Sequence, residues 1–350
     1  MSWSYLPRWK FTDSCGRPRV PGAIHVGCAH SEHMQCAHTS RRTFLKGGIA
    51  IVGGAGMATV VDPGEVFAQV RVFPPPPPAV SPIAGLMDTH VHAAPDVFGR
   101  SLDDEEVAIL YKDRGLEALV LKNHVLPTAD RAWFVSPAGG INPDAVNWMW
   151  RMQGGYGRVV WFPTFDADNH VKHFKDAPEG IKVLDADGKV LPAVRDVLKI
   201  CAEQKLVVHT GHLSPSEALA VIAAGRDAGV DRLVVTHAQF EVVNMSFDEM
   251  KKAASMGAKL ELCAMGVLMG PEAHLAWMRH WRRVKVEETA AAVKEVGAQN
   301  FILATDLGQT GNPSPADGLQ LFVTDLMKAG LSKDQITTMG REVTGKLLMG

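Results

Sequence analysis

The sequence is poor in cysteine and carries almost no net charge, and each shortage excludes a class of protein. Three of its five cysteines, Cys15, Cys28 and Cys36, fall within the first forty residues. The other two, Cys201 and Cys263, do not make a disulfide framework, so we interpret both as core packing. The formal net charge of −2 produces no field that would attract nucleic acid or an anionic membrane surface, and neither is expected as a partner.

The N-terminal region lacks an apolar run long enough for a stable membrane anchor. The glycine-rich run 47–61 is shorter than the roughly 20 residues that span a bilayer. It follows Arg41 and Arg42, and the segment 40–68 as a whole resembles a twin-arginine signal peptide cleaved after Ala68. We therefore expect the twin-arginine export machinery and signal peptidase as partners, and a mature protein that is periplasmic or secreted.

The remaining boundaries follow from this signal. Residues 1–39 do not fit it, because the basic segment of a signal peptide normally starts near the N-terminus, and Met34 offers an alternative start. We interpret residues 1–39 as a non-native or disordered extension. The proline-rich stretch 69–82 is expected to be a linker, and 83–350 the folded domain.

Within the folded domain, short apolar runs alternate with amphipathic segments that carry helix start signals, such as Ser214 with Glu217. This alternation predicts an α/β fold, a (β/α) barrel of the TIM type. Seven strands are expected, at 86–89, 118–122, 159–163, 206–208, 233–236, 260–263 and 301–305. An eighth would follow the second, where only the short run 133–135 is a candidate. The third strand of the barrel is therefore expected to be shortened or missing.

Histidines and charged residues gather where these strands end. They are His90 and His92 after the first strand, Lys122 and His124 after the second, then His209, His212 and His237, and finally Asp306 after the last. The carboxyl ends of all barrel strands open on one face, so these side chains are expected to converge. Alternate residues of a strand point the same way, which aims two imidazoles of the first strand at the barrel mouth. Neutral imidazoles suit zinc, manganese or iron, and the pattern predicts a divalent metal site.

This arrangement resembles that of the amidohydrolase superfamily over roughly residues 83 to 349. The residues that match its pattern are His90 and His92 in Asp88-Thr89-His90-Val91-His92, His209, His237, and Asp306 in Ala304-Thr305-Asp306. The resemblance implies that these residues bind one or two metal ions, with zinc the first choice, and we add His124 as a further ligand. A likeness to an uncharacterised branch of the superfamily is carried by Leu121-Lys122-Asn123-His124, Asp166-Ala167-Asp168-Asn169-His170 and Asp306-Leu307-Gly308-Gln309.

The resemblance also implies a mechanism. Metal-activated water would attack the substrate, with Asp306 as general base. His237 or His212 would orient the substrate oxygen. His170 and Gln309 are further candidates for substrate binding.

The sequence departs from the superfamily at one position. Many members bridge two metals with a carboxylated lysine or a glutamate on the fourth strand, and the stretch 161–164 offers neither. Lys122 lies on the second strand instead. As a candidate catalytic residue it would be carboxylated and bridge two ions, bind a substrate anion, or pair with an acidic side chain structurally.

We predict a metal-dependent hydrolase of a small amide, lactone or related carbonyl substrate. Phosphoester hydrolysis is an alternative, because His-x-His followed by a second-strand histidine also resembles the polymerase-and-histidinol-phosphatase family. Decarboxylation, which some amidohydrolase relatives perform, is another. A periplasmic metal- or solute-binding protein without turnover is the alternative outside enzymes. Assembly into a homo-oligomer is left open.

Overall fold

The computed structural model describes residues 81–96, 98–122, 141–151 and 155–350. The predicted extension, the export signal and nearly all of the linker lie outside the described residues. So do the candidate strand 133–135 and the predicted ligand His124. Among the described residues, no helix combines the length and the apolar character needed to cross a membrane.

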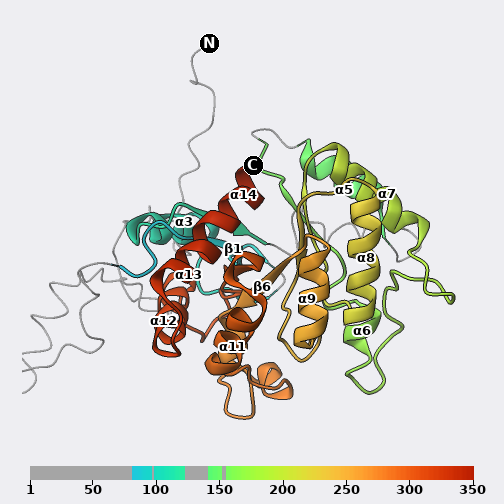
Figure 1. Cartoon of the computed structure of the whole chain (residues 1–350). Helices are drawn as coiled ribbons and strands as arrows, with labels where there is room; N and C mark the ends of the chain where they lie inside the picture. The colour runs from blue at the N-terminus through green and yellow to red at the C-terminus, as the bar shows by residue number, and fades with distance from the viewer. Residues whose placement is uncertain (1–80, 97, 123–140, 152–154) are drawn as a thin grey trace, which may run out of the picture. The chain divides into compact units, whose positions relative to one another are not determined.

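Each of the seven predicted strands is present. They are β1 (Met87–Val91), β2 (Ala118–Leu121), β3 (Val159–Trp161), β4 (Val207–His209), β5 (Leu233–Val235), β6 (Lys259–Cys263) and β7 (Phe301–Ala304). The α-helices are α3 (Asp104–Asp113), α5 (Pro143–Trp150), α6 (Asp168–Val171), α7 (Pro192–Glu203), α8 (Pro215–Asp227), α9 (Phe247–Ser255), α10 (Met265–Leu268), α11 (Val286–Val296), α12 (Pro315–Lys328), α13 (Lys333–Thr337) and α14 (Thr344–Met349). Shorter segments are the 3-10 turns η1 (Ala276–His280) and η2 (Ala298–Asn300) and the π-helical segment η3 (Thr338–Val343). Figure 1 shows strands and helices alternating along the chain.

All the strand pairs are parallel. β3 to β7 form one sheet in sequence order, and β1 pairs with β2. The chain just beyond β7 joins these two sheets, because the Asp306 amide donates to the His90 carbonyl at 2.8 Å and the His92 amide to the Leu307 carbonyl at 2.9 Å. The spatial order is therefore β2-β1-β7-β6-β5-β4-β3, which confirms the predicted parallel β/α fold. The predicted short third strand falls in the undescribed stretch 123–140.

The predicted helix start at Ser214 is confirmed. The Ser214 side chain accepts from the Glu217 amide, and the Glu217 side chain accepts from the Ser214 amide, so each residue caps the other. This reciprocal pair satisfies two amides that the first turn of α8 would leave without partners. The helix then returns the chain along the sheet to the start of β5.

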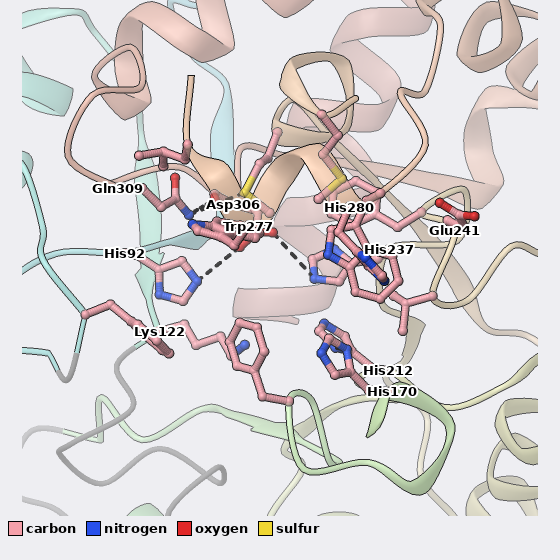
Figure 2. A pocket seen from close by; sticks show the side chains of 18 of the residues that line it. His92, Lys122, His170, His212, His237, Glu241, Trp277, His280, Asp306 and Gln309 are labelled. Atoms are coloured by element: carbon pink, nitrogen blue, oxygen red, sulfur yellow. Dashed lines mark hydrogen bonds and ion pairs between the residues drawn. The ribbon is translucent and has the colours of Figure 1, made fainter. Parts of the chain in front are cut away.

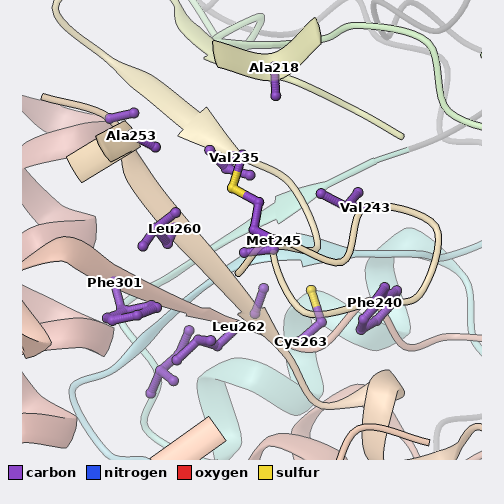
Figure 3. Close-up of a cluster of buried hydrophobic side chains, with 14 of the residues drawn as sticks. Ala218, Val235, Phe240, Val243, Met245, Ala253, Leu260, Leu262, Cys263 and Phe301 are labelled. Carbon is purple, nitrogen blue, oxygen red and sulfur yellow. The ribbon is translucent and has the colours of Figure 1, made fainter. Parts of the chain in front are cut away.

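Two apolar layers lie on opposite sides of the strands. Outward side chains such as Val235 and Leu260 pack with helix residues such as Ala253 of α9, as Figure 3 shows. A separate inner cluster has the members Val159, Trp161, Val207, Val234, Ile302, Val343 and Leu347. Since strand side chains alternate, the inner face carries His209 two residues after Val207 in β4 and Thr236 two residues after Val234, just beyond β5. Polar groups thus begin one layer above an apolar base.

Asp88 fixes the position of β1 against the end of β7. Its carboxylate accepts from the His90 amide (3.0 Å), the Thr305 amide (3.0 Å), the Thr305 hydroxyl (2.7 Å) and the Tyr111 hydroxyl of α3 (2.6 Å). Complete burial raises the pKa of Asp88 to about 6, while these donors act in the opposite direction. The network ties together the two strand ends that carry His90 and Asp306.

Candidate metal centre

Asp306 lies between imidazoles that come from both sheets. Its Oδ1 atom is 3.0 Å from His92 Nε2 and 3.2 Å from His90 Nε2, and its Oδ2 atom is 3.6 Å from His237 Nε2. Figure 2 shows His92 and His237 facing this carboxylate from opposite sides. One potential ligand atom from each of His90, His92 and Asp306 lies within 4.8 Å of the others. The structure therefore brings four of the predicted site residues together.

The backbone at two of these residues is unusual. His237 has φ of 50° and Asp306 has φ of 55°, a left-handed conformation that non-glycine residues rarely adopt. Such a conformation costs on the order of 1–3 kcal/mol and persists only where surrounding structure enforces it. Both residues follow the last residues of their strands, β5 and β7, so the turns aim their side chains across the strand ends.

Glu261 is a member of the centre that the sequence interpretation missed. It lies fully buried in the middle of β6, with Oε1 3.3 Å from His90 Nδ1 and Oε2 3.3 Å from His237 Nδ1. The His237 amide also donates to it at 3.1 Å. A second group of potential ligand atoms within 4.8 Å of one another comprises His90, His237, Glu261 and Cys263. The signal was a charged residue in the middle of an apolar strand, since such residues are rarely buried without a partner.

Cys263 lies closer to this centre than the core-packing interpretation implies. Its Sγ atom is 3.2 Å from His237 Nδ1, and the thiol belongs to the second group of potential ligands. Burial, followed by the charge of Glu261, raises its pKa well above the ordinary value. Cys201 is buried on α7, where burial raises its pKa to about 12, so this thiol agrees with a packing role.

His209 lies beside the centre without joining either group of potential ligands. Its Nδ1 atom is 3.7 Å from Glu261 Oε1 and 3.4 Å from the Thr236 hydroxyl, and its ring centroid is 4.7 Å from that of Trp161. Burial lowers the pKa of His209 to about 3. A role as metal ligand for His209 stays a prediction.

The donor set fits a divalent cation. Burial lowers the pKa of His237 well below 6.5, which keeps the imidazole in the neutral form that binds metals. Burial also raises the pKa of Glu261, and raises that of Asp306 to about 8, because two carboxylates removed from water are unfavourable as anions. A cation between neutral imidazoles and carboxylates would offset this cost. Imidazole, carboxylate and thiol groups are the ligands that zinc and related transition metals prefer.

Four further predicted site residues within the described part of the chain line one pocket of about 660 Å³ beside the centre. Lys122 and His212 line it, and His170 joins them with its Nδ1 atom 2.8 Å from His212 Nδ1. One of these two nitrogens must donate while the other accepts, so the pair shares one proton along this contact. Gln309 donates from Nε2 to the Asp306 carbonyl at 2.8 Å. This bond braces the left-handed turn that carries Asp306.

Lys122 is a buried residue of the pocket lining. Its side chain is almost fully enclosed, and Nζ lies 5.6 Å from the centre of a Trp161 ring. Its positive charge acts to lower the pKa of Asp306, against the larger effect of burial. The ammonium therefore acts electrostatically on the same centre as the histidines.

Several solved structures are similar to the chain at low sequence identity. An amidohydrolase from Pseudomonas aeruginosa has a TM-score of 0.47 at 9% identity, with 77% of this chain and 97% of that chain covered. An amidohydrolase (cog3618) from Burkholderia multivorans with bound Zn has a TM-score of 0.47 at 14% identity, covering 76% and 99%. A 2,6-dihydroxybenzoate decarboxylase from Rhizobium has a TM-score of 0.45 at 12% identity, covering 76% and 98%. Likenesses this distant assign no reaction to the chain.

No curated protein matches the sequence. A family profile described as "Family of unknown function (DUF6282)" matches residues 85–261, from just before β1 into β6. The matched stretch includes His90, His237 and Glu261, whereas Asp306 lies beyond it. Because the match covers just over half of the 350 residues, the chain belongs to this family.

Proposed function

We propose that the protein is a metal-dependent hydrolase of small amide, lactone or related carbonyl substrates. The observation that carries the proposal is the single carboxylate of Asp306 set 3.0–3.6 Å from the imidazoles of His90, His92 and His237 at the wall of a pocket. A carboxylate set among imidazoles is suited to holding a cation beside a group that can accept a proton. It contains four of the five residues on which the amidohydrolase resemblance rests, while His209 lies beside them.

In this proposal, the residues of the centre bind the metal and transfer the proton. His90, His92, His237 and Asp306 would hold a divalent ion, with zinc the first choice and one or two ions accommodated. The bound ion would supply Lewis acidity toward the scissile carbonyl and lower the pKa of water. Asp306 would accept a proton from that water and return it to the leaving group. The strained turns at His237 and Asp306 and the Gln309 bond hold these side chains in place.

Glu261 would position His90 and His237. Its two oxygens face the Nδ1 atoms of these residues at 3.3 Å, which leaves Nε2 of each ring directed at Asp306. Residues that hold ligating imidazoles in this way also fix the tautomer. The overlapping group with Cys263 offers a place for a second ion.

His212 and His170 would act on the substrate. Both line the pocket, and because one Nδ1 atom donates to the other, one ring keeps an N–H on Nε2 and the other keeps a lone pair on Nε2. Burial lowers the pKa of His170 to about 4, so the pair is neutral near pH 7. A neutral imidazole there can donate a hydrogen bond to a substrate oxygen without adding charge.

We also propose that the protein acts outside the cytoplasm after twin-arginine export. The support is the Arg41-Arg42 pair followed by the run 47–61. The test fuses residues 1–82 to a reporter and follows export, with Arg41→Lys plus Arg42→Lys as the variant. Export that persists in a strain lacking the twin-arginine machinery would contradict the assignment.

The test of the enzymatic proposal combines elemental analysis with a panel of amides, lactones, phosphoesters and aromatic acids. We expect about one or two equivalents of zinc or a related metal, chelator-sensitive hydrolysis of a carbonyl substrate, and loss of activity in His90→Ala and Asp306→Asn. Asp334→Asn, an exposed aspartate at the start of α13, is the matched control. Wild-type turnover that survives both site changes would refute the mechanism, and turnover of phosphoesters alone would favour the phosphoesterase alternative.

A further inference from the structure

Aromatic side chains gather around the pocket although they are scarce in the sequence. Aromatic residues make up 7% of the chain, yet the pocket is lined by Phe98, Phe165, Phe174, Phe240, Trp277 and Trp281. Segments that follow β1, β3, β5 and β6 supply them, so their convergence is a property of the fold. Phe174 and Trp277 each leave 42% of their surface exposed. Large apolar surfaces left open at a concave site mark a place where a ligand covers them.

The rings of one side form a continuous wall. The ring centroids of Phe174 and Trp281 are 5.7 Å apart at 81°, and that of Trp281 lies 5.3 Å from His170. The first pair packs edge to face and the second is tilted by 47°, and both separations are those of rings in contact. Trp277 lies on the same short segment η1 that ends beside Trp281. A planar ligand would contact rings whose positions are already fixed by packing against one another.

The positive charge of a buried lysine in the pocket lining favours an anionic group. Lys122 lines the pocket, and its positive charge acts to lower the pKa values of Asp306, His212 and His237. The other carboxylate that lines the pocket, Glu241, accepts a hydrogen bond from the Arg282 amide. A cation enclosed by protein attracts an acid group more strongly than it would in water.

The volume of the pocket limits the size of the ligand. The pocket holds about 660 Å³, whereas a cavity of roughly 150 Å³ is enough to bind benzene. One or two fused rings with a carboxylate and a reacting group therefore fit with room for water. A long flexible chain or a polymer end would gain little from rigid ring walls.

We infer that the pocket takes aromatic acids: molecules with a one- or two-ring planar body and a carboxylate. The ring body lies against Phe174, Trp277 and Trp281, and the carboxylate points toward Lys122. This inference names the substrate class of the proposed hydrolase and rests on that function only for the reaction. Binding itself needs no turnover.

The experiment measures equilibrium binding of three probes by calorimetry, on metal-loaded protein and again after chelation. The probes are 2-naphthoate, the saturated decalin-2-carboxylate of the same carbon skeleton, and uncharged 2-naphthylmethanol. We expect naphthoate to bind about tenfold more tightly than either other probe, in both forms of the protein. Agreement between the two forms shows that the carboxylate preference does not come from the metal.

Variants assign the preference to residues. Trp277→Leu is expected to weaken naphthoate about tenfold and decalin-2-carboxylate less than about twofold. Trp148→Leu, at a 74% exposed tryptophan of α5 outside the pocket lining, is the matched control and should change neither. Lys122→Met should weaken both acids and leave naphthylmethanol unchanged. If that variant does not fold, the wild-type comparison of naphthoate with naphthylmethanol still tests the charge.

Equal affinities for naphthoate and decalin-2-carboxylate would overturn the aromatic part of the inference. Equal affinities for naphthoate and naphthylmethanol would overturn the acidic part, and absence of binding by every probe at millimolar concentration would overturn both. A protein that shows both preferences but hydrolyses no carbonyl substrate would refute the proposed reaction while leaving the ligand class supported.

Discussion

Replacing Glu261 with glutamine should weaken metal binding while leaving the fold intact. The side chain keeps its length and one carbonyl oxygen, which can still accept from the His237 amide now 3.1 Å away. What disappears is the negative charge and one of the two acceptors that face His90 and His237 at 3.3 Å. At least one of the two imidazoles then loses the partner that fixes its ring and tautomer.

The size of the effect follows from this geometry. Losing a partner that orients one metal-binding histidine commonly weakens metal affinity by about 10–100-fold. Because one carboxylate serves two imidazoles, we expect about 100-fold, which corresponds to roughly 2.8 kcal/mol at about 1.4 kcal/mol per factor of ten. If Glu261 is itself a ligand, as its place in the second donor group allows, the loss should be larger still.

The assay is competition for Zn²⁺ against a chromophoric chelator, with the wild type and Glu203→Gln, an exposed glutamate at the end of α7, measured alongside. Thermal unfolding in the presence of chelator checks that the metal-free folds are equally stable. A dissociation constant for Glu261→Gln within about threefold of the wild type would refute the positioning role.

Three further predictions follow from the same network. Asp306→Asn should lower kcat by about 10²–10⁴-fold, as expected for loss of a general base, with unchanged circular dichroism and an unaffected Asp334→Asn control. Metal binding should release about one proton at pH 7 and progressively less above pH 8, because burial raises the pKa of metal-free Asp306 to about 8; calorimetry in buffers of different ionisation enthalpy measures this, and no release at pH 7 would contradict it. Tyr111→Phe should lower the free energy of unfolding by about 1–3 kcal/mol in urea titrations, since Asp88 loses a buried 2.6 Å hydrogen bond, and a loss below about 0.5 kcal/mol would show that the Asp88 network is not a main anchor of β1.

Much of the fold could be predicted because its signals are local. Period-two and period-three-to-four patterns and capping pairs such as Ser214 with Glu217 mark the elements, and every predicted strand within the described residues is present. The convergence of His90, His92, His237 and Asp306 followed from one topological rule, that parallel strands open their carboxyl ends on one face. The sequence does not specify which atoms then meet.

Glu261 and Cys263 escaped prediction for a physical reason. They alternate with Leu260 and Leu262 on β6, and the same alternation of polar and apolar residues is typical of a surface strand with one face in solvent. Only the surroundings show that this strand is buried along most of its length, so that its polar side faces the barrel interior. The rarity of buried carboxylates was the available signal, and it becomes decisive once the strand is known to be central.

The hydrogen bonds around the centre indicate that its side chains are positioned before a metal ion binds. Asp88 accepts four hydrogen bonds that join β1, the end of β7 and α3, and none of them involves a candidate ligand side chain. The left-handed turns at His237 and Asp306 are held by hydrogen bonds to their carbonyls, from the Phe240 amide to His237 and from the Gln309 side chain to Asp306. Removing the metal should therefore leave the barrel folded with His237 neutral and Asp306 protonated at pH 7, and chelation should lower the melting temperature without abolishing the cooperative transition. A chelated protein that loses its near-ultraviolet circular dichroism would show instead that the ion organises the site.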